Sequence, residues 1–214
     1  MPAKELAFSI GGHMGVILIG AGGHAMSVLD CIDKSEVVGF IDEFKQGEYN
    51  GIKILASSIY DLEDKEQHQY HIAIGNVEVR ERWKHVVDKL GLKLVNVIAD
   101  EARVSKSSVI GNGNFIGKNV VIDAGVAIGD NNIVNTGAIV EHGSVIGDNC
   151  NIATLAVLNG DVQVGNQVFV GSNAVCNGQL SIGDGATVGS GAVVTRSVES
   201  GATVVGIPAR EIAL

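Results

Sequence analysis

Residues 128–153 read IGDNNIVNTGAIVEHGSVIGDNCNIA, and an aliphatic residue returns in this stretch at every sixth position. The same period runs from Ile110 to Val194, where fourteen of the fifteen sixth positions are Ile, Val or Leu and the other is Cys176. In twelve of the fifteen cases the residue that follows is Gly, Asn or Asp. A period of six fits neither an α-helix nor an ordinary strand, so it indicates a solenoid.

A short strand that ends at a tight turn explains both features of this repeat. Gly and Asn supply the backbone conformations that tight turns need. The aliphatic residues beside the turns point inward and stack from coil to coil into one column. Three six-residue sides close a triangular coil, so the run corresponds to about five coils. The pattern therefore predicts a parallel β-helix over residues 101–200.

The composition describes a folded chain without a surface for nucleic acid or membrane. Of the 214 residues, 46% are hydrophobic and 29 are Gly, and the net charge of −9 offers no basic patch for a nucleic acid. No apolar run reaches the roughly 18 residues that span a bilayer, so we expect no membrane insertion. Cys31, Cys150 and Cys176 lack metal-ligand spacing and are typical of reduced cytosolic thiols.

The sequence suggests four segments. Residues 1–13, MPAKELAFSIGGH, precede a second Met and are interpreted as a leader or tag. Residues 14–100 alternate strand and helix patterns, which predicts a small Rossmann-like α/β domain with a parallel sheet. Residues 101–200 are the β-helix, and residues 201–214 are a C-terminal segment. The expected strands of the first domain are 16–19, 37–41, 72–74 and 94–98, and its expected helices are 25–32 and 79–90.

A glycine motif follows the first expected strand. The spacing Gly20-x-Gly22-x-x-Ala25, with Asp42 about twenty residues on, fits the fingerprint of loops that hold a phosphate at a helix start. Only about 85 residues separate Met14 from the repeat, which is enough for one half of a dinucleotide-binding fold. We therefore favour a nucleotide-sugar site over NAD or a purely structural turn. His24 is either a solvated helix-start residue or a donor to phosphate or base.

His142 is the only histidine of the repeat, and it follows Glu141 at a turn. An imidazole there is either a solvated surface residue or a general base for an attacking nucleophile. A catalytic zinc site of the carbonic anhydrase type needs three His ligands, so one His predicts a site without metal. Between Lys118 and Arg196 the chain has no Lys or Arg, which leaves Arg196 and Arg210 to meet a phosphate or to face solvent.

These motifs resemble the PglD/NeuD-like sugar acetyltransferase family. Residues 128–153 resemble hexapeptide-repeat acyltransferases, and VGIPAR at 205–210 resembles the closing motif of that superfamily. GAGGH at 20–24, the strand end IDE at 41–43 and IGN at 74–76 resemble the N-terminal domain of the family. The resemblance implies a left-handed β-helix that assembles as a homotrimer, with acetyl-CoA in the clefts between neighbouring β-helices.

The resemblance also implies roles for particular residues. His142 would be the general base, with Glu141 beside it as a candidate to orient the ring. The other implied residues are Asn151, Gly160, Ser172, Ser190 and Arg210 for acetyl-CoA, and Gly22, Gly23, His24, Asp42, Glu43, Gly75 and Asn135 for the acceptor. The chain departs from the family in two places: Gly143 stands where some members have a carboxylate after the His, and Asn151 where many have a second His.

The implied reaction is direct acetyl transfer from acetyl-CoA to the amine of a nucleotide-linked 4-amino-4,6-dideoxy sugar, with UDP favoured as the nucleotide. The N–H of Gly160 is a candidate donor to the oxyanion. Such products feed bacterial surface glycans, which implies a cytoplasmic enzyme. Two alternatives remain: O-acetylation of a sialic acid or other sugar, and a β-helical scaffold without catalysis.

Overall fold

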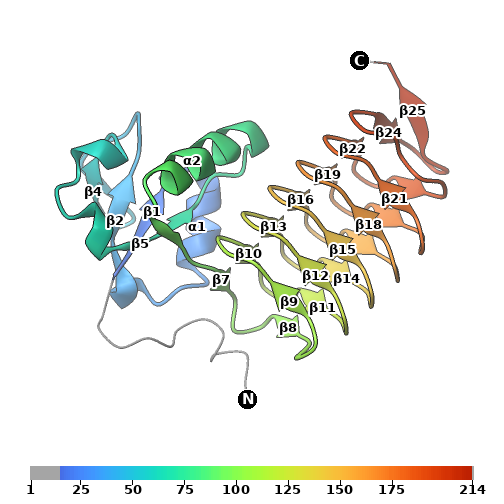
Figure 1. The fold of residues 1–214 in the computed structure, drawn as a ribbon, viewed down its shortest axis with the longest axis horizontal. Coiled ribbons are helices and arrows are strands. Elements are labelled where there is room, and N and C mark those ends of the chain that lie inside the picture. Colours follow the sequence, from blue (N-terminus) through green and yellow to red (C-terminus); the bar gives the residue numbers. More distant parts are fainter. Residues whose placement is uncertain (1–14, 214) are drawn as a thin grey trace. The chain divides into compact units, whose positions relative to one another are not determined.

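The computed structural model describes residues 15–213, and the segment interpreted as a leader lies outside this range. The chain forms two compact units, with the boundary between Ile98 and Ala99. The first unit is a mixed α/β structure and the second is built from short parallel strands (Figure 1).

A six-stranded sheet in the order β3-β4-β2-β1-β5-β6 forms the centre of the first unit. Its strands pair in parallel except β3 and β4, which form an antiparallel hairpin at one edge. The strands are β1 (Val16–Ile19), β2 (Val37–Ile41), β3 (Glu48–Tyr49), β4 (Ile52–Ala56), β5 (Gln69–Ile72) and β6 (Lys93–Leu94). The helices are α1 (Gly23–Leu29) and α2 (Val77–Lys89), with 3-10 turns η2 (Lys34–Glu36), η3 (Ile59–Asp61) and η4 (Lys65–Gln67).

The expected strands 16–19 and 37–41 are confirmed, whereas four other expectations need correction. The expected strand 94–98 is divided between β6 and β7 (Val97–Ile98), which belong to different sheets. The hairpin of β3 and β4 was not anticipated, so the sheet is mixed rather than wholly parallel. The expected strand 72–74 ends at Ile72, because Ile74 leaves the sheet and packs over the Cα of Gly20. The first helix ends at Leu29 rather than at Ile32.

Three sheets form the second unit together with the last two residues of the first, and their strands are parallel except for the final strand, which pairs antiparallel with its neighbour. Sheet I, which also receives the last strands of the chain, contains β7 (Val97–Ile98), β10 (Phe115–Ile116), β13 (Ile133–Val134), β16 (Asn151–Ile152), β19 (Phe169–Val170), β22 (Thr187–Val188), β24 (Thr203–Val205) and β25 (Arg210–Ile212). Sheet II contains β8 (Arg103–Val104), β11 (Val121–Ile122), β14 (Ile139–Val140), β17 (Val157–Leu158), β20 (Val175–Cys176) and β23 (Val193–Val194). Sheet III contains β9 (Val109–Ile110), β12 (Ala127–Ile128), β15 (Val145–Ile146), β18 (Gln163–Val164) and β21 (Ser181–Ile182).

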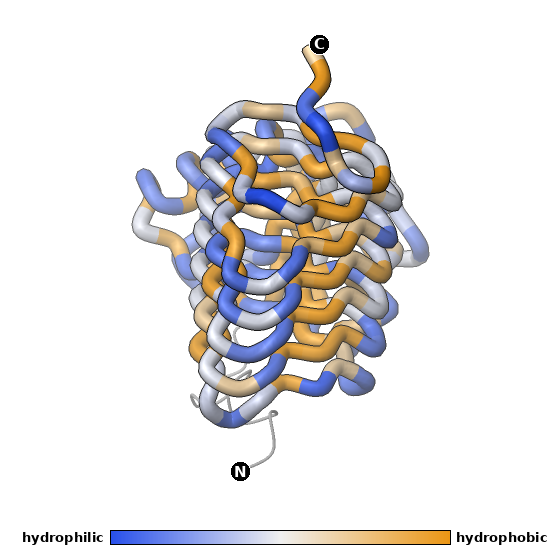
Figure 2. Tube along the Cα trace, turned by 90° about the vertical axis from the view of Figure 1, so that its right-hand side faces the viewer, coloured by the Kyte–Doolittle hydropathy of each residue, from blue (hydrophilic) through white to orange (hydrophobic). Residues whose placement is uncertain are grey.

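The register of these sheets confirms the predicted β-helix. In sheet II, Val121 pairs with Ile139 and Ile139 pairs with Val157, so each residue lies beside the residue eighteen positions on. The second residue of each strand from β11 to β23 points inward and is buried, and these residues stack into continuous hydrophobic columns (Figure 2). Because each coil buries its aliphatic residues only against adjacent coils, the whole stack is needed to exclude water from the core.

A polar ladder along one edge explains the recurring Gly-Asp and Gly-Asn pairs. Asp148 Oδ1 accepts a hydrogen bond of 2.7 Å from Asp130 N, and Asn166 Oδ1 accepts one of 2.8 Å from Asp148 N. Each acceptor oxygen lies against the glycine of the preceding coil, so that a Cβ on Gly147 would lie 2.6 Å from Asn166 Oδ1. Glycine is required there by close approach rather than by positive φ.

Candidate active site

A pocket of about 220 Å³ in the first unit brings together all six residues expected there to bind the acceptor. It lies beyond the carboxyl ends of β1, β2 and β5, where ligands of open parallel sheets bind. The six residues are Gly22, Gly23, His24, Asp42, Glu43 and Gly75. Apolar side chains complete its wall, namely Ile41, Phe44, Ile74, Val79 and Trp83. These residues come from four separate segments, and the parallel sheet brings them to one edge.

The Asp42 carboxylate holds the loops of this pocket together. Its Oδ2 accepts a hydrogen bond of 2.7 Å from Ala21 N, and its Oδ1 accepts bonds from Phe44 N at 3.0 Å and Lys45 N at 2.9 Å. Burial acts to raise the pKa of Asp42, but these three N–H donors and the Lys45 charge outweigh it and hold the pKa below its usual value. Asp42 is therefore an ionised loop clamp, and Glu43 is the neighbouring carboxylate, paired at 3.1 Å with Arg82.

Glycine occupies the positions of this loop for different physical reasons. Gly20 has a φ of +94°, and a Cβ there would collide with Ile74. Gly22 and Gly23 have no protein atom within 4 Å of the place where a Cβ would be, and neither has a left-handed φ. Protein conformation and packing therefore leave both positions free for a side chain. The open space in front of them belongs to the pocket.

His24 lines this pocket and lies near the buried side chain of His71. Burial, the nearby His71 and the Arg80 charge together lower the pKa of His24 to about 4. Burial and Arg80 likewise lower the pKa of His71 to about 4, although its 3.0 Å contact with the carbonyl oxygen of Val95 opposes the shift. Both imidazoles are neutral at neutral pH, so His24 offers a ligand a hydrogen bond rather than a positive charge.

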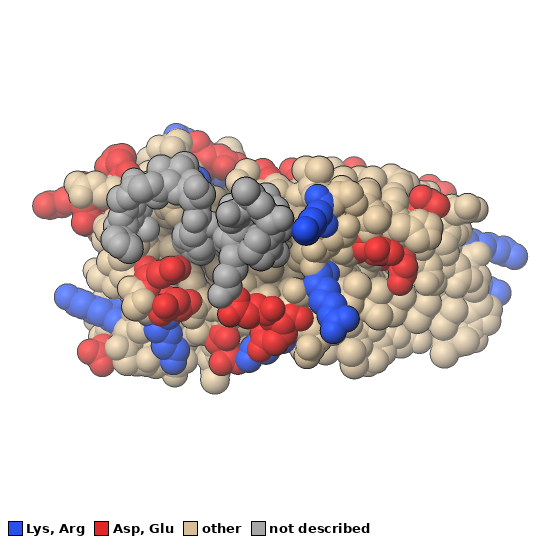
Figure 3. All heavy atoms as spheres, turned by 90° about the horizontal axis from the view of Figure 1, so that it is seen from below, with Lys and Arg blue, Asp and Glu red and all other residues tan. Residues whose placement is uncertain are grey.

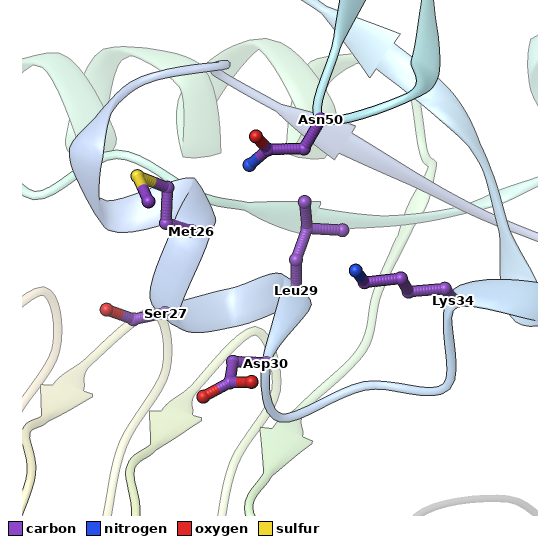
Figure 4. Close-up of a pocket in the computed structure, with 6 residues that line it drawn as sticks. All are labelled: Met26, Ser27, Leu29, Asp30, Lys34 and Asn50. Carbon is purple, nitrogen blue, oxygen red and sulfur yellow. The ribbon is translucent and has the colours of Figure 1, made fainter.

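A second, larger hollow of about 330 Å³ contains none of the expected residues. Figure 4 shows that it lies along α1 and next to the turn that carries Asn50. Its lining residues are Met26, Ser27, Leu29, Asp30, Lys34 and Asn50. The residues expected to bind a ligand line the smaller pocket on the glycine loop.

The β-helix places its expected residues along the two edges of sheet II. We call the turns that follow its strands the histidine edge (residues 141–143, 159–161 and 177–179). The turns that precede its strands are the serine edge (residues 117–119, 135–137, 153–155, 171–173 and 189–191). His142 and Gly160 lie on the histidine edge, whereas Asn135, Ser172 and Ser190 lie on the serine edge. One chain therefore keeps His142 and Asn135 apart, on opposite sides of β14.

The exposed His142 ring rests on the backbone of the next coil. A Cβ on Gly160 would lie 2.5 Å from Cε1 and 2.7 Å from Nε2 of His142. Among the described residues, no hydrogen bond from the chain holds either ring nitrogen, and none joins Glu141 to His142. The ring is thus positioned by packing on Gly160 and presents its nitrogens to solvent. This contact was not anticipated, because it depends on the offset of eighteen residues between coils.

A carboxylate also lies at the turn where the sequence has Gly143. Gly143 has a φ of +68°, and a Cβ there would collide with the carboxylate of Asp161 in the next coil. Asp161 N donates a 2.9 Å hydrogen bond to the carbonyl oxygen of His142. The histidine edge therefore carries a carboxylate beside the His142 turn, supplied from the following coil. Sequence reasoning missed Asp161.

Two expected residues lie away from both edges. Asn151 belongs to β16 in sheet I, and its side-chain oxygen is buried without a hydrogen-bond partner in the described part of the chain. Arg210 is exposed on β25, and its Nη1 donates to the carbonyl oxygen of Ala209 at 2.8 Å. Charge is otherwise sparse on the β-helix, as the face in Figure 3 illustrates.

Within residues 15–213, no group of three or more His, Cys, Asp or Glu side chains is arranged to hold a metal ion. No helix in that range is both long and apolar enough to cross a membrane.

Three family descriptions match parts of the chain. The PglD N-terminal domain matches residues 15–87. The bacterial transferase hexapeptide (six repeats) matches residues 143–178. The hexapeptide repeat of succinyl-transferase matches residues 108–142 and 161–196.

Several solved structures are similar along nearly the whole chain. One is a variant of perosamine N-acetyltransferase from Caulobacter crescentus, with a histidine replaced by asparagine, in complex with CoA and GDP-perosamine. It is 30% identical with a TM-score of 0.89, over 96% of this chain and 99% of that one. The acetyltransferase domain of PglB from Neisseria gonorrhoeae with acetyl coenzyme A is 31% identical, with a TM-score of 0.88 over 94% and 100%. WeeI from Acinetobacter baumannii is 30% identical, with a TM-score of 0.86 over 93% and 100%.

A protein of Acanthamoeba polyphaga mimivirus without a described function is 34% identical over 105 residues, which is 48% of this chain. The chain spans about a fifth (21%) of that protein's length. The similarity to the three solved structures, in contrast, extends over both units and nearly their full length. The chain belongs to the PglD/NeuD-like family of hexapeptide-repeat sugar acetyltransferases.

Proposed function

We propose that this protein transfers the acetyl group of acetyl-CoA to the amine of a nucleotide-linked 4-amino-4,6-dideoxy sugar, with His142 as general base. The observation that carries the proposal is the seating of His142 on Gly160, which fixes an exposed imidazole at one edge of sheet II. The similar structures that hold CoA and GDP-perosamine support the two substrate classes. A nucleotide-linked acceptor for surface glycans would place the enzyme in the cytoplasm.

The chemistry requires one proton acceptor and one oxyanion donor. The acceptor amine attacks the thioester carbonyl carbon, a C–N bond forms, and His142 takes the proton from the nitrogen. The N–H of Gly160 would donate to the oxyanion, since the described chain uses it in no other hydrogen bond. The C–S bond then breaks, and the CoA thiolate leaves with the proton from the imidazolium. Cys150 and Cys176 are buried and take no part.

The pocket of the first unit would hold the nucleotide part of the acceptor. Gly22 and Gly23 leave room for a diphosphate to approach the backbone, and the neutral His24 would donate one hydrogen bond. Apolar groups such as Trp83 and Ile74 offer surface for a base or a ribose. The resemblance of the sequence favours UDP, whereas the Caulobacter structures contain GDP, and an assay with both nucleotides distinguishes them.

A homotrimer would bring the two edges of sheet II together. The outward residues of this sheet form an apolar, half-buried column, made of Val121, Ile139, Val157, Val175 and Val193. In a ring of three chains about an axis parallel to the β-helix, with sheet II facing the axis, the histidine edge of each chain meets the serine edge of the next. The histidine edge would then face the serine edge of a neighbouring chain, which carries Asn135, Ser172 and Ser190, with acetyl-CoA between the two edges.

The first test is release of free CoA thiol from acetyl-CoA with a panel of UDP- and GDP-linked 4-amino sugars and matched hydroxyl-only sugars. We expect turnover with an amino sugar and a kcat in His142→Ala lower by about 10²–10⁴-fold. Folding should persist because the ring is exposed. Turnover with hydroxyl-only acceptors would favour O-acetylation, and absence of CoA binding would favour a scaffold.

Gly160→Ala tests the seat of the histidine. The new methyl group would displace the His142 ring, which lies at the end of a movable side chain. We therefore expect kcat to fall about tenfold or more while the unfolding temperature changes little, since misplacement by 1 Å can cost about 10²-fold. Gly125→Ala cannot serve as the control. No neighbouring atom would meet the new methyl group, but the φ of +70° at Gly125 would strain an alanine. Gln163→Ala on sheet III is the control. A wild-type kcat in Gly160→Ala would contradict the inference that Gly160 positions the His142 ring.

Gly23→Ala tests the pocket of the first unit. A methyl group at Gly23 meets no protein atom within 4 Å, and Ala favours the helix by up to about 1 kcal/mol. Stability should therefore be equal or higher. The methyl group would stand where the diphosphate approaches, so we expect KM for the acceptor to rise about tenfold with KM for acetyl-CoA unchanged. Ser27→Ala on the far side of α1 is the control, and an unaltered acceptor KM would argue against this pocket.

Val157→Lys tests the assembly. A charge in the centre of the apolar column would be buried three times in a trimer, at a cost of several kcal/mol per ion. We expect sedimentation to change from a trimer to a monomer, with loss of turnover because each site needs two chains. Gln163→Lys places the same charge on the outward face of sheet III and should stay trimeric. A trimeric Val157→Lys would show that sheet II does not face the axis.

A further inference from the structure

Leu155 has a backbone conformation that its side chain does not favour. Its φ is +59°, and the other described non-glycine residues with positive φ are all Asn, Asp or Gln. A bulky apolar residue in the left-handed region is an outlier. Such strain persists where the surrounding structure imposes it, and it gathers at ligand sites.

The chain itself shows what this position ordinarily needs. The corresponding residues in the other turns of the serine edge are Asn119, Gly137, Asn173 and Gly191. Only the turn 153–155 has a branched apolar side chain there. Burial does not explain the choice, since Leu155 is 51% exposed. Neither the conformation of the turn nor burial in the core therefore explains why position 155 is a leucine.

The leucine side chain covers the turn that carries Asn135. A Cβ on Gly137 would lie 2.6 Å from Leu155 Cδ2, so glycine at 137 lets the side chain lie flat on that turn. Leu155 N also donates a 3.0 Å hydrogen bond to the carbonyl oxygen of Thr136. An exposed apolar group thus stands directly above the Asn135 turn, on the outer surface of the serine edge.

In the proposed trimer this surface faces the catalytic base. One coil of eighteen residues rises by about 4.8 Å. His142 follows the turn 135–137 and precedes the turn 153–155 along the same coil path. In the trimer the three chains are at the same level along the β-helix axis. On the neighbouring chain, the turns just below and just above the level of His142 are therefore those with Asn135 and Leu155. Asn135 offers a polar contact and Leu155 an apolar one.

We propose that Leu155 determines acceptor specificity by packing against the C6 methyl group of a 6-deoxy sugar. This inference rests on the proposed function. In a 4-amino-4,6-dideoxyhexose, the methyl group is attached to C5, the carbon next to the one that bears the amine. A site that holds the amine at His142 must therefore also meet the methyl group. A sugar with a 6-hydroxyl would set that hydroxyl against leucine and lose its hydrogen bonds with water.

The test compares two acceptors that differ only at C6, a nucleotide-linked 4-amino-4,6-dideoxyhexose and the 4-amino-4-deoxyhexose with a 6-hydroxyl. The readout is the ratio of kcat/KM for the two. In Leu155→Asn and Leu155→Gly we expect the preference for the 6-deoxy sugar to fall about tenfold or more, the scale of one methyl-sized contact in an apolar pocket. The unfolding temperature should be equal or higher, because Asn and Gly relieve the strain.

Two control variants separate specificity from structure. Leu155→Met keeps an apolar side chain and should keep the preference. Gln167→Gly relieves a similar φ of +58° at the edge that does not border sheet II, and should leave the ratio unchanged. A wild-type ratio in both Leu155→Asn and Leu155→Gly would overturn the proposal. So would a change confined to the choice between acetyl-CoA and propionyl-CoA, which would assign Leu155 to the acyl group.

Failure of the proposed function would look different. In that case the wild-type protein itself would transfer acetyl to neither acceptor, and the inference would fall with it. If the wild-type protein is active and the Leu155 variants lose stability with an unchanged ratio, only the Leu155 proposal fails. The leucine would then serve to pack on Gly137.

Discussion

The second unit depends on the hydrogen bonds between coils, which pair each strand residue with the residue eighteen positions on. Val121 N bonds to the carbonyl oxygen of Ala138, and Ile139 N bonds to that of Ala156, and the pattern continues along the stack. Because the pairing offset stays at eighteen from β8 to β23, each position there becomes a straight column, whereas the last coil pairs at an offset of sixteen. A residue can then touch the one eighteen places later, as His142 touches Gly160. The edges of sheet II are linear arrays of turns for the same reason.

Much of this architecture can be predicted from sequence because its causes are local. The inward aliphatic positions repeat without interruption, so strands and coil length follow from the period alone. In the first unit, Gly20, Gly22 and Asp42 each lie just after a strand. The carboxyl ends of parallel strands meet at one edge. Their convergence in one pocket therefore follows from topology, and the structure brings all six expected residues there.

The parts that escaped prediction depend on side-chain contacts between distant residues. The β3–β4 hairpin has only two and five residues in its strands and a sequence without clear alternation. The seat of His142 on Gly160 and the carboxylate of Asp161 over Gly143 join residues of successive coils. Sequence reasoning placed His142 at a turn but missed Asp161. It could not tell which turn residues fill the space that a glycine of the preceding coil leaves open.

In both units, backbone conformation and packing explain the structural residues but do not explain the candidates for ligand contact. Gly20 is explained by its φ and by Ile74, and Gly147 by the oxygen of Asn166. Gly22 and Gly23 are explained by neither, because a side chain there would meet no protein atom. Leu155 is the converse case, a large exposed side chain where the turn favours none. Gly22 and Gly23 lack a side chain although the protein has room for one, and Leu155 has a side chain that its backbone conformation disfavours. A ligand that needs space at the first unit and an apolar contact at the serine edge would account for all three.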